Sequence, residues 1–233
     1  MKKVFANEWI GINFKEFSIA SNTELPDKLF YENFYSILEH KYCSIEKLPH
    51  QWLKDKKESS TELFKLIKKV SAKKILSIGS GIRVMENFIS KLDSSLKFYC
   101  EDFGSVSNSF VRDHDNVMPL SSEDISNFSY DLIILNNVDY ALTNDDYFKL
   151  LRKFNFLDFD YILISDVFLA EKMTIKSLIG HSLKKLLGWQ LWGYCRFINE
   201  HSEIFQKAGF KIFLEGEDLR GRNFFFLKKK DQS

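Results

Sequence analysis

From about residue 71 onward, short apolar runs alternate with stretches in which apolar positions recur at helical spacing. The apolar runs predict buried strands, and the intervening stretches predict helices. Such alternation is typical of a mostly parallel sheet covered by helices on both faces. We therefore predict an α/β domain with a Rossmann-like doubly wound sheet. Its expected strands cover residues 75–78, 96–100, 116–120, 130–137 and 160–166, although Pro119 weakens the third.

The pattern changes near the end of the chain. A helix is expected over residues 202–208, closed by Gly209, and two apolar runs follow at 210–214 and 223–227. The connection over residues 215–222 is too short for a helical crossover. The last two strands should therefore pair as a C-terminal antiparallel hairpin.

Residues 1–70 contain no strand–turn–helix unit. Helix starts are expected near Pro26 and Pro49, and a further helix over residues 60–70. We predict an N-terminal helical extension or cap over 1–70, followed by the sheet domain over 71–233.

The sequence Ser77-Ile78-Gly79-Ser80-Gly81 places a tight turn between the first strand of that domain and a helix. Glycine permits backbone conformations closed to other residues and leaves no side chain between the backbone and a ligand. The helix start beyond the turn presents free N–H groups. This arrangement is typical of a site for a nucleotide-like cofactor.

Composition narrows the range of functions. The chain has 233 residues, 45% of them hydrophobic, and a formal net charge of +1, so no nucleic-acid footprint is expected. The three cysteines are far apart and the histidines lack metal-ligand spacing, which predicts no metal site. His201 is expected to be exposed. The N-terminus does not resemble a signal peptide and no apolar run is long enough to span a bilayer, so a cytoplasmic location is expected.

The order of parts resembles the class I S-adenosylmethionine-dependent methyltransferases, whose seven-stranded sheet ends in an antiparallel hairpin. The resemblance is carried by the glycine turn, the acidic pair Glu101-Asp102, the strand ending in Asn136-Asn137, and the terminal hairpin. It implies S-adenosyl-L-methionine as cofactor and S-adenosyl-L-homocysteine as product. The cofactor-binding residues that it implies are Ser77, Gly79, Ser80, Gly81, Glu101, Asp102, Phe103, Asn136 and Asn137.

In the family, the acid after the second strand binds the ribose hydroxyls. Asp102 lies 23 residues after Gly79, close to the expected spacing, and is preferred over Glu101. The sequence departs from the family pattern at two positions. Ser77 stands where an acid is frequent, and Arg83 where a third glycine is frequent. Arg83 is interpreted either as an ion pair with the cofactor's carboxylate or as a surface side chain.

The resemblance further implies that residues 168–198 form an insertion on the substrate side. Methyl transfer needs mainly alignment and exclusion of water, with a base helping an alcohol acceptor. Asp166 and His181 are the candidate catalytic residues. Tyr140, Trp189, Trp192 and Tyr194 are candidates for binding a small-molecule or saccharide acceptor at oxygen. Each has an ordinary packing alternative.

The stretch 170–188 is basic and amphipathic. It could cover the sheet or lie on an anionic membrane surface. Packing needs its apolar face, so stable membrane insertion is not expected.

Two other functions remain open. A dinucleotide-binding oxidoreductase using NAD would need a glycine where Val84 stands. A non-catalytic binding subunit with this fold is favoured by Ser77 and Arg83, and its cofactor pocket would be closed. The sequence does not predict an oligomeric state.

Overall fold

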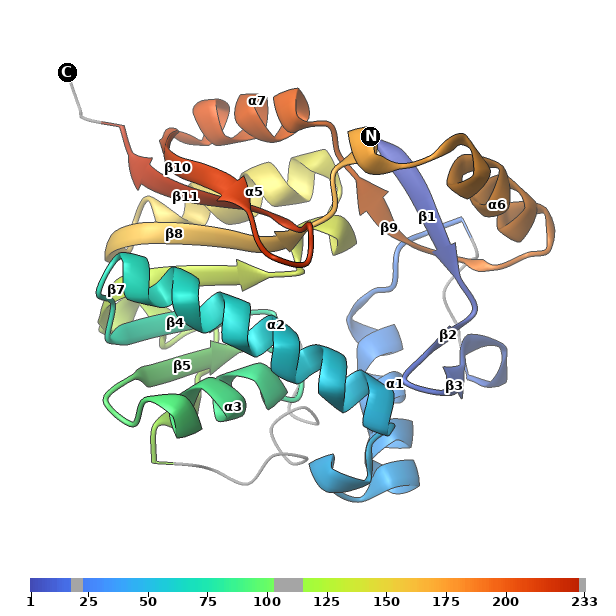
Figure 1. Ribbon diagram of the computed structural model, residues 1–233, viewed down its shortest axis with the longest axis horizontal. Coiled ribbons are helices and arrows are strands. Elements are labelled where there is room, and N and C mark those ends of the chain that lie inside the picture. The colour runs from blue at the N-terminus through green and yellow to red at the C-terminus, as the bar shows by residue number, and fades with distance from the viewer. Residues whose placement is uncertain (18–22, 103–114, 231–233) are drawn as a thin grey trace.

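The structure is a computed structural model that describes residues 1–17, 23–102 and 115–230. Its centre is a seven-stranded sheet with the strand order β10-β11-β8-β7-β4-β5-β6 (Figure 1). The strands are β4 (Lys74–Ile78), β5 (Lys97–Glu101), β6 (Val117–Pro119), β7 (Ser129–Asn136), β8 (Asp158–Val167), β10 (Phe210–Glu217) and β11 (Asn223–Lys229).

Strands β4 to β8 pair in parallel, whereas β11 runs antiparallel to both β8 and β10. The predicted fold class is therefore confirmed, including the short third strand and the terminal hairpin. Strand β6 ends at Pro119, which pairs with Cys100 and lies on the outermost strand. An edge strand tolerates proline because one side of its backbone needs no sheet partner.

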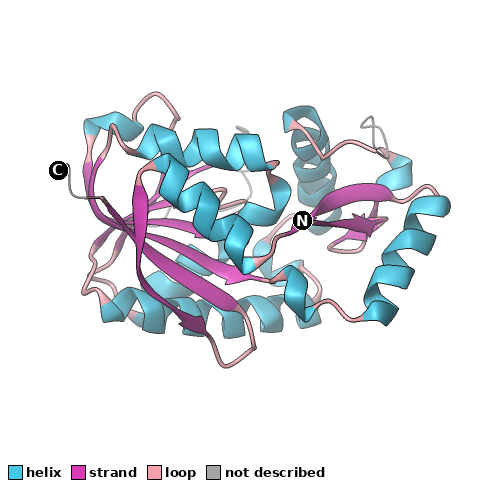
Figure 2. Ribbon diagram, turned by 90° about the horizontal axis from the view of Figure 1, so that it is seen from above, coloured by secondary structure: helices cyan, strands magenta, loops and turns pink. Residues whose placement is uncertain are grey.

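Helices cover both faces of the sheet (Figure 2). On one face, α2 (His50–Lys69) and α3 (Val84–Leu92) bury side chains such as Ile67 and Ile89 against the strands. On the other face, α5 (Asn144–Phe154) and α7 (Ile198–Ala208) bury Leu151 and Phe205. Two apolar layers therefore hold the carboxyl ends of β4, β5 and β7 at one edge.

The N-terminal portion differs from the expected helical extension. Strand β1 (Lys2–Ala6) pairs antiparallel with β9 (Gln190–Cys195), and β2 (Glu8–Trp9) pairs with β3 (Ile12–Asn13). Strand β1 was not predicted because its partner β9 lies far away along the chain. Strands β2 and β3 are two residues long each, too short to show an alternating pattern. The two helices expected around residues 49–70 are a single helix, α2.

Helix α1 (Lys28–Tyr42) begins where predicted, because the Asp27 side chain accepts a hydrogen bond from the Phe30 N–H. Its buried aromatic face meets β2, β3 and β9, and Trp9 stacks on Phe34 with ring centroids 4.5 Å apart. We call β1, β2, β3, α1 and β9 together the cap.

Helix α6 (Ile175–Leu186) connects β8 to β9 and lies beside β1, at the far side of the cap from the sheet (Figure 1). None of its residues is buried. The expectation that its apolar face packs on the protein is therefore wrong. Short 3-10 turns occupy Phe14–Glu16, Ile45–Lys47, Ile125–Asn127, Asp139–Ala141 and Ala170–Lys172.

No helix in 1–17, 23–102 or 115–230 has the length and apolarity needed to cross a bilayer. Within the same ranges, no three or more His, Cys, Asp or Glu side chains gather as metal ligands.

Candidate cofactor site

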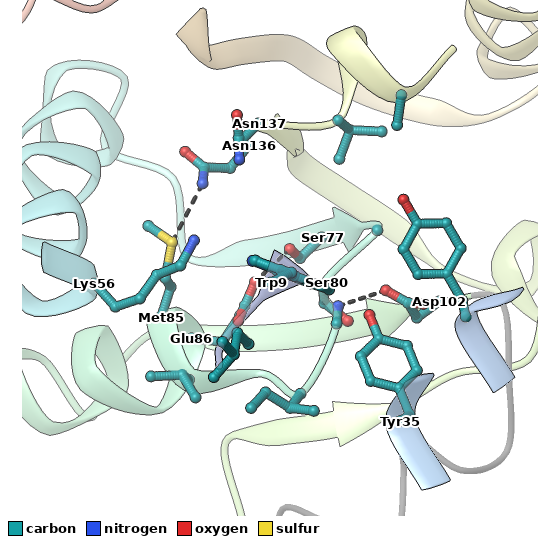
Figure 3. A pocket seen from close by; sticks show the side chains of 18 of the residues that line it. Trp9, Tyr35, Lys56, Ser77, Ser80, Met85, Glu86, Asp102, Asn136 and Asn137 are labelled. Atoms are coloured by element: carbon teal, nitrogen blue, oxygen red, sulfur yellow. Dashed lines mark hydrogen bonds between the residues drawn. The ribbon is translucent and has the colours of Figure 1, made fainter. Parts of the chain in front are cut away.

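A pocket lies where the carboxyl ends of β4, β5 and β7 meet the cap (Figure 3). The space between its walls amounts to about 910 Å³, a figure that includes open solvent. Its described wall includes Ser77, Gly79, Ser80, Gly81, Asp102, Asn136, Asn137 and Tyr140 from the predicted site. It also includes Trp9, Tyr31, Tyr35, Trp52, Lys56 and Glu86, which the sequence analysis did not select.

The glycine turn requires glycine for two physical reasons. Gly79 and Gly81 have φ values of +67° and +57°, which side chains disfavour. A Cβ on Gly79 would also lie 2.7 Å from the Val138 Cγ2 atom. The turn therefore brings bare backbone against the strand-end residues that form the pocket wall.

The two acids after β5 lie in different surroundings. The Asp102 carboxylate lines the pocket and accepts a hydrogen bond from the Gly81 N–H. The Glu101 carboxylate accepts from the Ser122 hydroxyl at 2.6 Å and is absent from the described pocket wall. The geometry thus favours Asp102 over Glu101, as the sequence spacing did. Phe103 lies outside the described residues.

A carboxylate from another residue lies beside Ser77. Its hydroxyl donates to Glu86 Oε1 at 2.6 Å, and Glu86 lies in the first turn of α3. Glu86 is buried, which raises the pKa of its carboxyl. Among the described residues, its second oxygen has no hydrogen-bond partner. An acidic residue in the helix turn after the glycines was the sequence signal that could have identified it.

Lys56 brings a positive charge to the same pocket from α2 (Figure 3). Burial lowers the pKa of its amine, while Asp166 and Glu86 act in the opposite direction. The sequence offered no signal for Lys56, because it is one of several lysines along α2 and only the path of the helix places it in the pocket.

Asn136 and Asn137 lie at the end of β7, the strand that pairs with β4, and both line the pocket (Figure 3). The Asn136 amide donates to the Met85 sulfur at 3.2 Å and accepts from the Ser165 hydroxyl at 2.8 Å. Asn137 has a φ of +55° and donates its backbone N–H to the Ser165 carbonyl. These contacts hold the Asn136 amide and the Asn137 backbone in place.

Three tyrosines form the wall on the cap side. Burial raises the pKa of Tyr31, Tyr35 and Tyr140, and the nearby Asp102 carboxylate raises those of Tyr31 and Tyr35 further. Their hydroxyls therefore stay protonated near neutral pH and serve as hydrogen-bond donors rather than as bases.

The predicted substrate-binding residues Trp192 and Tyr194 on β9, and Trp189 just before it, are absent from the described pocket wall. The Trp192 ring stacks on Phe14 at 4.9 Å and lies 6.3 Å from Tyr140. Trp189 and Tyr194 pack in a separate cluster with Phe5. The structure thus places these side chains in the packing of the cap, with Trp192 directly behind the pocket residue Tyr140.

The two candidate bases are not brought to this pocket. Asp166, at the end of β8, faces a smaller neighbouring pocket, where its carboxylate lies 3.3 Å from Arg220 and 3.5 Å from Arg222. His181 lies on α6, and its Nδ1 accepts a hydrogen bond from the Phe5 N–H. Each side chain therefore has a structural contact of its own.

Arg83 and His201 are both buried, with 1% and 0% of their surface exposed. The interpretation of Arg83 as a surface side chain is therefore wrong, and Arg83 is also absent from the described pocket wall. The expected exposure of His201 is likewise wrong. Its ring packs among Tyr147, Phe205 and Phe225.

Comparisons by sequence found no matching family model and no matching curated protein. Comparisons by structure found many matches. The mitomycin 7-O-methyltransferase MmcR aligns with a TM-score of 0.64 at 13% identity, covering 93% of this chain and 63% of that one. Human N-acetylserotonin methyltransferase in complex with SAM gives 0.61 at 13% identity, covering 87% and 56%.

A third neighbour is the magnesium protoporphyrin IX methyltransferase of Synechocystis with bound SAH. It aligns with a TM-score of 0.56 at 10% identity, covering 75% of this chain and 83% of that one. This chain spans less than two thirds of the first two neighbours. At these identities the comparisons establish the fold.

Proposed function

We propose that this chain, which has the fold of the class I S-adenosylmethionine-dependent methyltransferases, binds S-adenosylmethionine and transfers its methyl group to a small acceptor. One observation carries the proposal. The glycine turn, Asp102 and the Asn136-Asn137 pair, which are far apart in sequence, line one pocket. Two structural neighbours with the same fold hold SAM or SAH.

The charges of the pocket match the amino-acid end of that cofactor. An α-amino acid carries an ammonium and a carboxylate, and the pocket presents the Glu86 carboxylate and the Lys56 amine. The second Glu86 oxygen, which has no partner among the described residues, would accept from the ammonium. Glu86 thus supplies from α3 the negative charge that the family frequently places at the position of Ser77.

Asp102 would receive the ribose hydroxyls. One of its oxygens already accepts from Gly81, and a carboxylate has about four lone-pair sites. That hydrogen bond fixes the orientation of the carboxylate relative to the glycine turn. Binding therefore meets a carboxylate that is already positioned, which reduces the entropy lost on association.

Bound S-adenosylmethionine supplies a methyl group already activated by a sulfonium, so the protein's contribution is to align the acceptor and exclude water. The aromatic side chains of Trp9, Tyr31, Tyr35, Trp52 and Tyr140 suit a flat or ring-shaped acceptor, and we propose methylation at oxygen. The tyrosine hydroxyls would orient the acceptor by donating hydrogen bonds.

The test is calorimetric titration with S-adenosylhomocysteine, with NAD as the parallel titrant. We expect saturable binding of the former and none of the latter. Binding of NAD alone would instead support the oxidoreductase. Binding of neither would favour a non-catalytic subunit, although the open pocket argues against the closed site expected of one.

The variant Glu86→Gln tests cofactor binding separately from the stability of the fold. The amide keeps an acceptor for the Ser77 hydroxyl but loses the charge, so we expect S-adenosylhomocysteine affinity to fall about tenfold, equivalent to about 1.4 kcal/mol. The melting temperature at pH 8 should not fall, because a buried charge is removed. Glu62→Gln, on the adjacent helix α2 and outside the described pocket wall, is the control. Equal affinities for the Glu86 variant and the wild type would contradict this assignment.

A further inference from the structure

Helix α6 carries an apolar stripe that points away from the protein. Ile175, Ile179, Leu183 and Leu186 are 77%, 57%, 55% and 83% exposed. They recur at intervals of four, four and three residues, so they lie along one face of the helix. A surface helix normally turns such a stripe toward its own core.

The opposite face of α6 makes the contacts with the rest of the molecule. His181 accepts the hydrogen bond from Phe5 on β1, and Ser177, Leu178 and Lys184 are half-buried on the same side. Lys184 lies 5.0 Å over the Trp189 ring. The helix is thus held by its polar side, which fixes the apolar stripe outward.

Charge distinguishes what could cover the stripe. Within Ile175–Leu186 there are three lysines and no acidic residue. Lys176 and Lys185 are exposed. They lie on opposite sides of the stripe, about 65° and about 115° around the helix axis from its centre. An apolar face flanked by lysines is the pattern of a helix that lies in the plane of an anionic lipid surface, with its lysine ammoniums reaching the headgroups.

A second copy of the chain fits this face less well. A two-fold contact would place the stripe against itself and bring lysines near lysines. The repulsion of like charges would oppose that contact, whereas an anionic bilayer would neutralise them.

We infer that α6 is an interfacial helix that docks the protein on the surface of an anionic phospholipid bilayer. The stripe of Ile175, Ile179, Leu183 and Leu186 enters the boundary between headgroups and acyl chains. Lys176 and Lys185 contact the phosphate-bearing headgroups. The rest of the fold stays in water, and no segment spans the bilayer. This inference does not depend on the proposed methyltransferase activity.

The test is co-sedimentation of the full chain with vesicles of phosphatidylcholine alone and with vesicles containing about 30% phosphatidylserine. We expect binding to the anionic vesicles that weakens with salt, and at least tenfold weaker binding to the neutral ones. Absence of binding to both vesicle types would overturn the inference.

A matched pair of variants locates the contact. Leu186→Asp and Leu219→Asp change exposed leucines, 83% and 86% accessible, by the same charge. Leu219 lies in the loop between β10 and β11. We expect vesicle affinity to fall at least tenfold for Leu186→Asp and by less than twofold for Leu219→Asp. Equal losses in the two variants would overturn the assignment to α6.

Two further measurements complete the test. Lys176→Ser with Lys185→Ser should reduce binding to anionic vesicles and flatten its salt dependence, without changing the melting temperature. Analytical ultracentrifugation examines the alternative occupant. If the protein binds neither vesicle type and forms a dimer that Leu186→Asp dissociates, the stripe contacts a second copy of the chain. That result would reject the lipid surface.

Discussion

The sheet and the cap build the pocket in different ways. The sheet contributes the glycine turn, Asp102 and the two asparagines, all at the carboxyl ends of strands. The cap contributes Trp9, Tyr31 and Tyr35. The first set is backbone and short polar groups suited to a cofactor shared by many proteins of this fold. The second set is aromatic and, under the proposed function, would select the acceptor. Variants in the two regions should therefore fail in different ways.

Gly79→Val should have the largest effect, on the sheet side. The substitution forces a β-branched residue into a φ of +67° and places its Cβ 2.7 Å from Val138. We expect S-adenosylhomocysteine binding to disappear in calorimetry and the melting temperature to fall. Gly180→Ala is the control, because nothing lies within 4 Å of the added Cβ. It should retain full affinity. Undiminished binding by the valine variant would show that the turn does not contact the cofactor.

Phe5→Ala should affect the cap without affecting cofactor binding. Phe5 is buried against Leu191 and Tyr194, so its truncation should lower the free energy of unfolding by about 3 kcal/mol. None of the three lines the described pocket, so S-adenosylhomocysteine affinity should change less than threefold. Urea denaturation and calorimetry measure the two quantities. Phe156→Ala, at a residue 86% exposed, should change neither. A large loss of affinity in Phe5→Ala would show that the cap also positions the cofactor.

The variant His201→Leu tests how the stability of the sheet side depends on pH. Burial lowers the pKa of His201 to about 3, with Arg196 adding to the effect. The histidine of the unfolded chain has a pKa near 6.5, so its contribution to stability is complete above that pH and is lost as pH falls toward 3. Between pH 6.5 and 4.5 the wild type should lose about 2 to 3 kcal/mol more than the variant.

Asp139 lies 3.8 Å from His201. Because Asp139 also titrates, the wild type must be compared with His201→Leu and not studied alone. Burial raises the pKa of Asp139 to about 6, so its contribution is present below about pH 4 and is lost as pH rises through 6. The two groups therefore oppose each other over the same range, and only the comparison with His201→Leu isolates the histidine. Urea denaturation at both pH values measures it, with exposed His40→Leu as control. Identical pH dependence in wild type and variant would refute the depressed pKa.

The sheet could be predicted because its signals are local. Each strand is a short apolar run, and glycines mark the turn after β4. The spacing from Gly79 selected Asp102, and the structure places both in one pocket. The cap could not be predicted in the same way. Strand β1 begins with two lysines and buries only Phe5, and it becomes a strand only because β9 pairs with it.

The site residues that the sequence analysis missed follow the same division. Lys56 is one of several lysines on an amphipathic helix, and only the path of α2 brings it to the pocket. Glu86 was missed although it lies in the first turn of α3, directly after the glycine turn. Trp189, Trp192 and Tyr194 were selected for their aromatic character, but in the structure they pack within the cap. The residue types of these three positions indicated a possible chemistry, but they did not determine where the side chains point. The same holds for α6, whose periodicity predicted a helix but not the side that faces water.

The pairing of β1 with β9 also determines when the molecule can be completed during synthesis. Residues 2–6 leave the ribosome long before their partner at residues 190–195. Until then that early strand has an unsatisfied edge, which is a template for wrong pairing. The sheet strands β4 to β8, whose partners emerge within a few dozen residues of one another, can assemble in the meantime. Closure of the cap, which completes the aromatic wall of the pocket, is thus a late step in folding during synthesis.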